Sequence, residues 1–514
     1  MSEPVLEAPR LELPLRPAGA PGRGDRVALG ELAWRYRWLL AGGGLLLVSL
    51  LVVLWAGARP GYDPYGWLVW GKLSIHLKLD TNGAPSWKPL PFLFTVPFSL
   101  IGHYSLWLWM VFSVAVSLSG PIFAWRIAFR LTGADPARRY ASYAAGLAAA
   151  VFVFFMFDNV GRLTFTHYVL SAESDTMIVA LCLAAVDCHL TGRHRWAFWL
   201  WWLGSLGRPE VWPFLGLAGL WLWRARPGYR PWLYAGVGLL VFFWFIIPGL
   251  TSKSFFTAGN IAQNSPREVH GNKVTGTIDR FHGMLPNTIW VAAAITVAMA
   301  AWRRWWPVLV LAAGALVWLI IEIAFSLHGF PSVPRYMFEA GAIISVLAGV
   351  FIGRVILELP PLLRGLAGRI GGRRLSSQLA FRLGAWGTGA AIVVICATLL
   401  GAAGHQVRLE RADLKHERAR TTLIGRLSAV VHRLGPSRIM ACGQPNIPIE
   451  YQSVFAWYMG IKTGVLYVSQ TYLRAHPHPL VNIYPISGAG WKVFPSHVTA
   501  ASAASCSGLR LIYR

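Results

Sequence analysis

Residues 305–327 read WWPVLVLAAGALVWLIIEIAFSL, and Glu322 is their only ionisable residue. A helix needs about 20 apolar residues to cross the hydrocarbon core of a bilayer. The stretch therefore predicts a transmembrane helix. Arg303 and Arg304 stand directly before it, as is typical of the cytoplasmic end of a span.

The same pattern recurs along the 514-residue chain, which is 55% hydrophobic and 13% charged. Soluble domains carry roughly 25% charged residues, so the composition excludes a soluble globular enzyme, a disordered chain and a collagen-like chain. We predict an all-α polytopic membrane protein with about eleven transmembrane helices. The predicted spans lie near 37–57, 105–127, 140–157, 168–190, 196–207, 210–224, 231–250, 286–302, 305–327, 336–353 and 385–404.

The formal charge of +25 comes mainly from arginines between these apolar runs, which points to membrane topology rather than to nucleic acid. With the N-terminus cytoplasmic, the short inside connections hold Arg126, Arg130, Arg138, Arg139, Arg193, Arg195, Arg224, Arg226, Arg230, Arg303, Arg304, Arg354, Arg364, Arg369, Arg373, Arg374 and Arg382. The longer outside connections hold Lys72, Lys78, Lys88, Arg162, Lys253, Arg267, Lys273, Arg280 and Arg335. This asymmetry follows the positive-inside rule. We predict a multi-pass protein of the inner or plasma membrane.

Composition divides the chain into three parts. Residues 1–34 are polar and rich in Pro and Gly, and we predict a disordered cytoplasmic tail rather than a cleaved signal peptide. Residues 35–404 form the transmembrane domain, with outer loops 58–104, 251–285 and 328–335. An odd number of spans places residues 405–514 outside, as a small extracytoplasmic α/β domain that opens with a charged helical stretch, Arg408 to Arg426. Its two cysteines, Cys442 and Cys506, suit a disulfide in that location, with two free thiols as the alternative.

The first outer loop contains Gly61-Tyr62-Asp63-Pro64-Tyr65. Asp63 before Pro64 is typical of a helix N-cap with proline at the first helical position. The following helix separates apolar residues from Lys72 and His76, which predicts a helix lying flat in the membrane interface. Asp63 is therefore either a cap or a carboxylate held at the membrane surface as a general base, and one residue can serve both roles.

An acidic residue just after the first span, interfacial helices behind it and the stretch Lys88-Pro89-Leu90-Pro91 before the second span resemble the GT-C glycosyltransferases. The layout is similar to the bacterial branch that uses polyprenyl-phosphate sugars, with its aminoarabinose, mannosyl and arabinosyl transferases. In one respect the chain departs from that pattern. Many members carry a second acidic residue beside the first, whereas Asp63 stands alone. A divalent metal usually takes more than one acidic ligand, so we predict no metal ligands and no certain cofactor. A divalent metal stays as an alternative that the lone Asp63 does not support, and the lone carboxylate is compatible with a metal-free base.

Ionisable residues within spans are costly and mark function by default. Glu173 and Asp175 stand at the outer end of the fourth predicted span, and Arg208 and Glu210 flank Pro209. These residues form either structural ion bridges or a site where Arg208 meets a phosphate that Glu210 or Glu173 helps to orient. The resemblance favours the second interpretation.

The last outer loop ends in Arg335-Tyr336, a pair that resembles the family's contact with the lipid phosphate. A planar guanidinium suits bidentate phosphate recognition, and Glu339, one turn later, is placed to hold it. The alternative is that Arg335 reaches the lipid headgroups and Tyr336 is an ordinary interfacial aromatic. Lys88 has the same two interpretations.

These residues predict an inverting membrane glycosyltransferase that moves a sugar from a polyprenyl-phosphate donor to an envelope glycan or lipid acceptor on the outer face. Asp63 would be the general base, with Arg335, Tyr336, Lys88, Arg208, Glu210 and Glu173 at the donor. Loop 251–285 is either a lid or acceptor-binding loop, or an ordinary solvated loop. The alternatives are a lipid-linked sugar flippase, an enzyme similar to O-antigen ligases, and a structural assembly partner; nucleic acid is not an expected partner.

Overall fold

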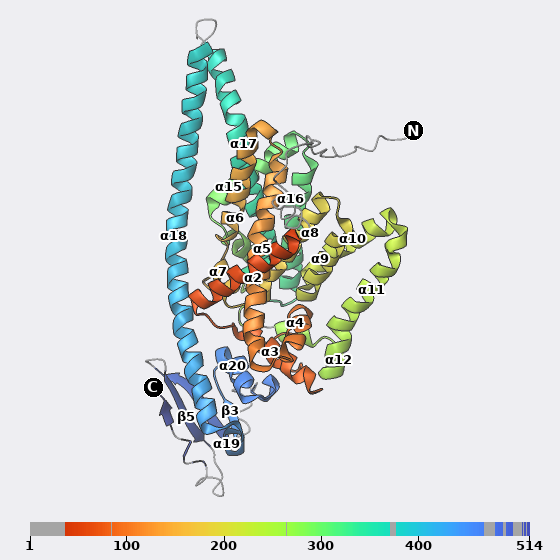
Figure 1. Ribbon diagram of the computed structural model, residues 1–514, viewed down its shortest axis with the longest axis vertical. Coiled ribbons are helices and arrows are strands. Elements are labelled where there is room, and N and C mark those ends of the chain that lie inside the picture. The colour runs from red at the N-terminus through yellow and green to blue at the C-terminus, as the bar shows by residue number, and fades with distance from the viewer. Residues whose placement is uncertain are drawn as a thin grey trace, which may run out of the picture. The chain divides into compact units, whose positions relative to one another are not determined.

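The computed structural model (Figure 1) describes residues 36–83, 85–263, 265–370, 377–466, 479–486, 490–496, 506, 508–509 and 511–513. The tail predicted for residues 1–34 lies outside these ranges. The chain divides into two compact units, Met1–Leu47 and Val48–Arg514. The described part of the first unit is the beginning of helix α2 (Arg37–Ala56), which is apolar and largely exposed.

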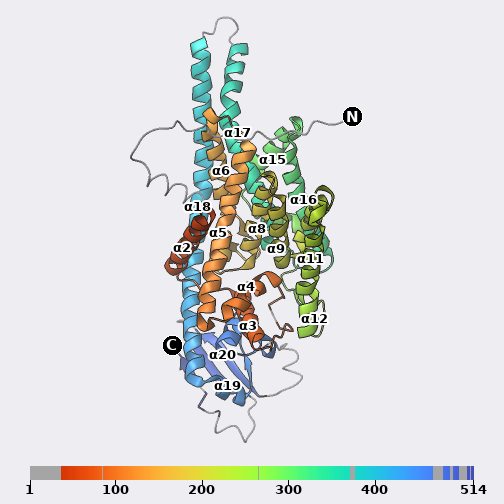
Figure 2. The same ribbon diagram turned by 45° about the vertical axis from the view of Figure 1, so that its right-hand side comes forward.

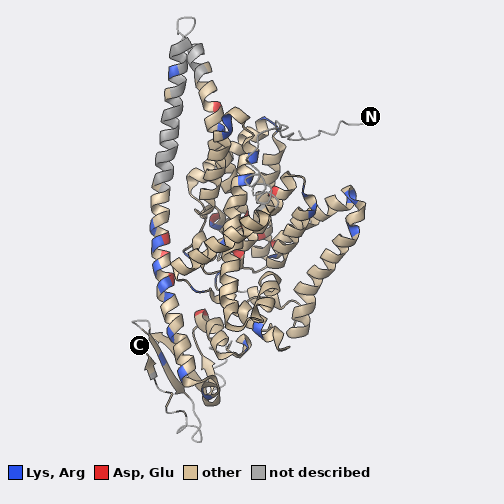
Figure 3. Ribbon diagram, viewed as in Figure 1, with Lys and Arg blue, Asp and Glu red and all other residues tan. Residues whose placement is uncertain are grey.

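Five helical segments in the described part of the chain are long and apolar enough to cross a membrane, and charged residues are a minority along them (Figure 3). A sixth candidate is a pair of helices bent by 98°, Lys273–His282 and Asn287–Trp302. The predicted spans all coincide with helical segments, but several of these are shorter than 18 residues. The count of eleven spans therefore stays a prediction. The five segments are Trp38–Ala56, Gly102–Thr132, Pro227–Thr251, Trp306–Leu327 and Pro334–Leu363.

Short apolar helices, turns and two small strands connect these segments. Their ends follow local rules: α5 stops at Gly133, which has a φ of 60°, and the Asn272 side chain accepts the first free N–H groups of α14. From residue 62 to residue 225 the elements are α3 (Tyr62–Ile75), α4 (Pro89–Ser99), η1 (Gly102–Tyr104), α5 (Ser105–Thr132), η2 (Pro136–Arg138), α6 (Arg139–Val153), β1 (Phe157–Asp158), β2 (Leu163–Thr164), α7 (Phe165–Leu170), α8 (Ser174–Leu190), α9 (His194–Gly207), η3 (Pro209–Val211) and α10 (Trp212–Ala225).

The second half of the helical region continues in the same way. Its elements are η4 (Pro227–Tyr229), α11 (Arg230–Val241), the π-helical turn η5 (Phe242–Ile246), α12 (Ile247–Thr251), α13 (Thr257–Ala262), α14 (Lys273–His282), α15 (Asn287–Trp302), α16 (Trp306–Leu327), η6 (Pro334–Met337), α17 (Phe338–Ile370) and α18 (Ser377–Leu434). The charged stretch from Arg408 to Arg426 is not a separate helix, because α18 continues through it from the last predicted span.

Helix α17 is central to the packing, with α5, α6, α8, α15, α16 and α18 against it (Figure 2). Small residues allow the closest approach. A Cβ added at Gly349 of α17 would lie 2.6 Å from the carbonyl oxygen of Ala145 in α6. Close backbone contact through glycine and alanine is how helices associate in lipid, where apolar burial gives little drive between them.

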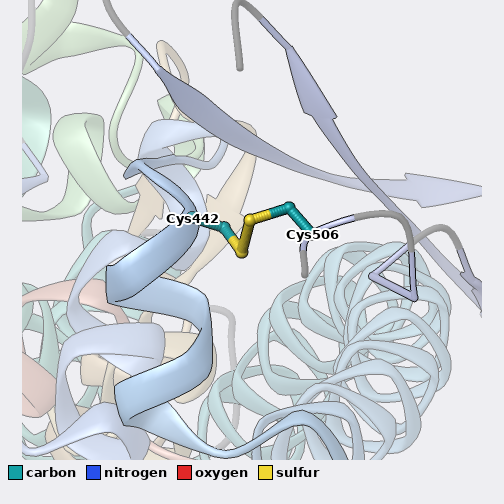
Figure 4. The surroundings of a disulfide bond; sticks show 2 residues. All are labelled: Cys442 and Cys506. Atoms are coloured by element: carbon teal, nitrogen blue, oxygen red, sulfur yellow. A yellow bond between two sulfur atoms is a disulfide. The ribbon is translucent and has the colours of Figure 1, made fainter. Parts of the chain in front are cut away.

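The C-terminal segment contains a four-stranded sheet in the order β3-β4-β5-β6, built from Gln444–Asn446, Leu480–Ile486, Gly490–Ser496 and Leu511–Tyr513. The β3–β4 pair is parallel and the other two pairs are antiparallel. Helices α19 (Pro436–Cys442) and α20 (Ile449–Met459) and turn η8 (Thr463–Val465) complete this segment. A disulfide joins Cys442, at the end of α19, to Cys506 (Figure 4).

Helix α3 does not expose one face along its length as predicted. Its residues from Pro64 to Gly71 are buried, because α4 and α20 pack against it. The rings of Trp67 and Trp109 lie 5.8 Å apart, centroid to centroid. Only the last turns of α3, with Lys72 and His76, are exposed. The helix is thus held by protein rather than resting on the surface.

Candidate active site

Asp63 lies in the first turn of α3, but it is not the helix cap. The N-cap is Gly61, and no side chain caps the helix. The Gly61 N–H donates to the carbonyl of Ser171 at 2.7 Å, so a tertiary contact fixes the helix start two residues earlier than expected. The Asp63 carboxylate faces Arg335 instead, with 3.9 Å between Oδ2 and Nη2, and it keeps 19% of its side-chain surface exposed.

Lys88 stands immediately before α4 and points toward the start of α8. Its ammonium donates to Ser174 Oγ at 3.2 Å and lies 3.8 Å from Asp175 Oδ1. The Trp67 ring lies beneath the ammonium, 5.6 Å from centroid to Nζ. Burial, and next the charge of Arg208, lower the pKa of Lys88 to about 8. The ammonium is thus desolvated, and its pKa lies much closer to neutral pH than that of an ordinary lysine.

The turn before α8 brings Glu173 against the start of α3. Ala172 in this turn has a φ of +58°, and its carbonyl accepts the indole N–H of Trp109 at 3.2 Å. The Glu173 carboxylate is so close to Gly61 that a side chain there would collide with it. Its charge interacts with those of Asp63 and Arg335, so this buried carboxylate belongs to the same cluster.

Arg208 is buried and forms ion pairs with two carboxylates. It donates to Asp175 and lies 3.7 Å from Glu210. Its guanidinium also stacks 4.1 Å above the Tyr336 ring. Among the described residues Arg208 thus forms ion pairs with Asp175 and Glu210, as one of the two interpretations expected, and none is formed with Glu173. Arg208 is held as a support behind the site.

Arg335 is the second residue of η6, and its guanidinium lies near two aromatic rings. The distances to the ring centroids are 5.7 Å for Tyr168 and 5.6 Å for Tyr336. Its predicted partner Glu339 does not hold it, since neither carboxylate oxygen of Glu339 has a hydrogen-bond partner. The contact predicted from helical spacing is therefore wrong. Asp63, from another segment, is the carboxylate that faces Arg335.

The sequence reasoning missed Arg280, which connects loop 251–285 with loop 328–335. From α14 its guanidinium donates to the carbonyls of Arg267 at 3.0 Å and Glu268 at 3.2 Å. It also donates to Pro331 at 2.5 Å, four residues before Arg335. Loop 251–285 is thus bonded to the segment that carries Arg335. No sequence signal marked Arg280, because its partners are backbone carbonyls of distant residues.

Helix α18 positions the other side of the site and was also missed. Arg420 donates to the carbonyls of Arg59 at 3.3 Å and Pro60 at 2.8 Å, directly before α3. The Asp413 carboxylate accepts a hydrogen bond from the imidazole of His167 in α7, with 2.8 Å between Oδ1 and Nδ1. The charged stretch that we assigned to the C-terminal domain therefore holds the segments from which Asp63 and Tyr168 project.

Several buried polar atoms of this cluster have no hydrogen-bond partner among the described residues. Buried polar groups in proteins are nearly always paired, so their accumulation in one place indicates a site that a polar ligand completes. No group of three or more His, Cys, Asp or Glu residues in the described ranges is arranged to hold a metal ion. The unpaired atoms are Glu173 Oε2, Asp175 Oδ2, Arg208 Nε, Glu210 Oε2, Glu322 Oε1, Arg335 Nε and both carboxylate oxygens of Glu339.

Chemically, the cluster combines a partly exposed carboxylate with an arginine and a lysine. The carboxylate can accept a proton, and the two cations can stabilise an anion. Asp63, Lys88, Glu173 and Arg335 come from four separate segments and meet at this place.

Comparison with known proteins gives matches among solved structures. No family model matches the sequence, and no curated protein matches it. ArnT from Cupriavidus metallidurans bound to undecaprenyl phosphate is 15% identical over 88% of this chain and 93% of its own, with a TM-score of 0.44. Its apo structure gives the same identity and coverage and a TM-score of 0.45. The Archaeoglobus fulgidus oligosaccharyltransferase is 11% identical over 84% of this chain and 64% of its own, with a TM-score of 0.41.

Proposed function

We propose that the protein is a membrane glycosyltransferase that moves a sugar from a polyprenyl-phosphate donor to a hydroxyl of an envelope glycan or lipid. The observation that carries this proposal is that Asp63 faces Arg335, with Lys88 near enough for its charge to interact with both. A sugar transfer needs a base for the acceptor hydroxyl and positive charge for the departing phosphate. This cluster supplies both within one buried, incompletely paired site.

In the proposed reaction, the acceptor oxygen attacks the anomeric carbon while Asp63 accepts the hydroxyl proton. The bond between the anomeric carbon and the phosphate oxygen breaks, and the electron pair leaves with the polyprenyl phosphate. Arg335 and Lys88 counter the charge that grows on this leaving group. A single displacement inverts the anomeric configuration.

The remaining residues would have supporting roles. Arg208, fixed by Asp175 and Glu210, would hold the ring of Tyr336 and add positive potential behind the phosphate. Glu173 would orient the sugar or the acceptor. Nothing in this scheme requires a metal.

The proposal includes a topology. Eleven spans would leave the N-terminus in the cytoplasm and residues 405–514 outside as a domain of their own, with residues 35–404 as the transmembrane domain. The disulfide between Cys442 and Cys506 supports an outside location, because disulfides persist in oxidising compartments. Asp63, Lys88 and Arg335 would then work on the outer face.

The test is sugar transfer by the purified protein in lipid nanodiscs. A panel of polyprenyl-phosphate pentoses and hexoses would be supplied with crude envelope acceptor. We expect transfer from one donor by the wild type and a fall of about 10²- to 10⁴-fold in Asp63→Asn, with the melting temperature unchanged because Asp63 is partly exposed. Wild-type turnover in the variant would remove Asp63 from the mechanism. Movement of labelled lipid-linked sugar between leaflets without transfer would replace the enzyme with a flippase.

A further inference from the structure

A second site lies between the end of α3 and the end of α20. It is a pocket of about 210 Å³ with three basic residues, Lys72, His76 and Lys78, around an apolar floor. The floor residues include Val69, Leu73 and Trp457. None of these residues belongs to the proposed donor site. A helix turns by 100° and rises by 1.5 Å per residue, so Lys72 lies on the side of α3 opposite Asp63, about 14 Å along the axis.

The pocket carries positive charge without a matching acid. No carboxylate is among its lining residues, and none within the described ranges forms an ion pair with its three basic side chains. The Lys72 ammonium lies 5.6 Å from the Trp457 ring centroid, a contact that leaves its hydrogen-bond donors for a ligand. The nearest acidic residue along the chain, Asp80, is paired with Lys462 at 3.2 Å. The chemistry of the pocket therefore suits an anion.

The residues that follow Lys78 connect the pocket to the end of a candidate membrane span. The amide of Lys78 donates to Leu73, closing a turn at Leu77, which has a φ of +53° and is 96% exposed. Three residues after Lys78, the Thr81 N–H donates to the carbonyl of Thr251 at 3.1 Å, and the hydroxyls of the two threonines lie 3.0 Å apart. Thr251 is the last residue of the candidate span Pro227–Thr251.

We propose that this pocket binds the phosphate of an anionic phospholipid. The headgroup phosphate is the anion that occurs at the end of a span, and basic residues there attract it. Lys72 and Lys78 would contact the phosphate, and an acyl chain would lie on the apolar floor beside the exposed Leu77. Binding would fix the junction of α3 and α20 at the membrane surface, whatever reaction the separate Asp63 site performs.

The experiment is a lipid titration of the full-length protein in uncharged maltoside detergent, followed by native mass spectrometry. The titration is repeated with Arg335→Ala, which weakens the proposed donor site and leaves the pocket intact, so that binding in the pocket should be unchanged. We expect phosphatidylglycerol to bind with one high-affinity site and phosphatidylcholine to bind weakly. The Lys72→Gln/Lys78→Gln double variant should weaken phosphatidylglycerol binding about thirty-fold, and Lys78→Gln alone about five-fold.

Lys253→Gln is the matched control, because Lys253 is an exposed lysine of another outer loop, and it should bind like the wild type. Both pocket lysines are exposed, so the variants are expected to fold, which their melting temperatures would verify. Equal binding of phosphatidylcholine, or full phosphatidylglycerol binding by the double variant, would overturn the proposal. Displacement of the lipid by inorganic phosphate would instead identify a soluble phosphate as the ligand and overturn the choice of a phospholipid.

Discussion

The two ends of helix α8 carry the same kinds of residues and use them differently. At one end, Asp187 accepts from Arg126 at 3.0 Å and from Arg130 at 3.1 Å, so both of its carboxylate oxygens are paired. At the other end, Asp175 meets Arg208 and Lys88, yet Asp175 Oδ2 has no partner. The Asp187 end is a completed ion bridge, whereas the Ser174 end retains polar groups for a ligand.

The comparison indicates that a structural charged group differs from a functional one in whether all of its polar atoms are paired, not in residue type. A buried carboxylate beside arginines occurs at both ends, and an ionisable residue inside a span is costly in either place. The difference is that both oxygens of Asp187 are paired, while further residues at the Ser174 end have polar atoms without a partner, Glu173 Oε2 and Arg335 Nε among them. The following predictions test this difference, in order of decreasing effect on transfer.

Arg335→Ala should have the largest effect of the four. Loss of one charge-stabilising donor typically costs about 10²- to 10³-fold in rate, and we expect a fall of that size in kcat/KM for the donor. Arg335→Lys should recover part of it. Steady-state kinetics in nanodiscs measure this, with Arg162→Ala as the control for an exposed arginine. An unchanged donor kcat/KM in Arg335→Ala would mean that the charged residues at the Ser174 end are structural, like those at the Asp187 end.

Arg280→Ala should have a smaller effect, because Arg280 acts through the loop that carries Arg335. We expect about a ten-fold fall in kcat/KM for the donor, arising from misplacement of Arg335. Arg267→Ala is the control. Arg267 lies in loop 251–285, as Arg280 does, but contributes its carbonyl rather than its side chain to this contact. If Arg280→Ala lowered only the melting temperature, the contact would serve stability alone.

The pH dependence of donor affinity tests Lys88. Burial and the nearby charge of Arg208 lower its pKa to about 8, so Lys88 is charged below about pH 8 and loses its proton as the pH rises through that value. The donor phosphodiester keeps its charge over this range. Donor affinity should therefore fall roughly five-fold between about pH 7 and about pH 9. In Lys88→Arg the fall in affinity should be smaller than in the wild type, because the arginine keeps its charge, and an equal fall in both proteins would exclude Lys88 from donor binding.

Asp187→Asn should leave transfer per folded molecule unchanged. Asp187 lies about 18 Å along α8 from Asp175, and its loss leaves Arg126 and Arg130 without their shared carboxylate. We expect the free energy of unfolding to fall by about 2 kcal/mol, below the range for fully buried pairs because Arg130 is 41% exposed. Denaturation in detergent and transfer in nanodiscs would be measured on the same preparation. A large loss of turnover would show that both ends of α8 serve the reaction.

The sequence predicted the helices well, because long apolar runs have few alternative structures. It also identified Asp63, Lys88, Glu173, Arg208 and Arg335, residues that the structure gathers in one region. Arg303 and Arg354, which the sequence placed in one group, share Glu358. The orientation of these groups across the membrane stays a prediction.

The details that failed depend on tertiary contacts. Asp63 fits an N-cap by local pattern, but the bond from Gly61 to Ser171 starts α3 earlier. Glu339 fits Arg335 by helical spacing, yet Asp63 approaches from another segment. Arg280 and Arg420 bind backbone carbonyls far away in the chain, and such partners leave no pattern in the residues around them. Local sequence rules therefore identified the residues of the site but not which of them contact one another.

The measurement that tests the central claim most directly is equilibrium binding of undecaprenyl phosphate to the protein in nanodiscs. Wild type would be compared with Arg335→Ala and with Arg126→Ala, which removes the same charge at the other end of α8. We predict that Arg335→Ala weakens binding at least about ten-fold and that Arg126→Ala leaves it unchanged. Equal weakening by both variants, or by neither, would contradict a phosphate site at the Ser174 end.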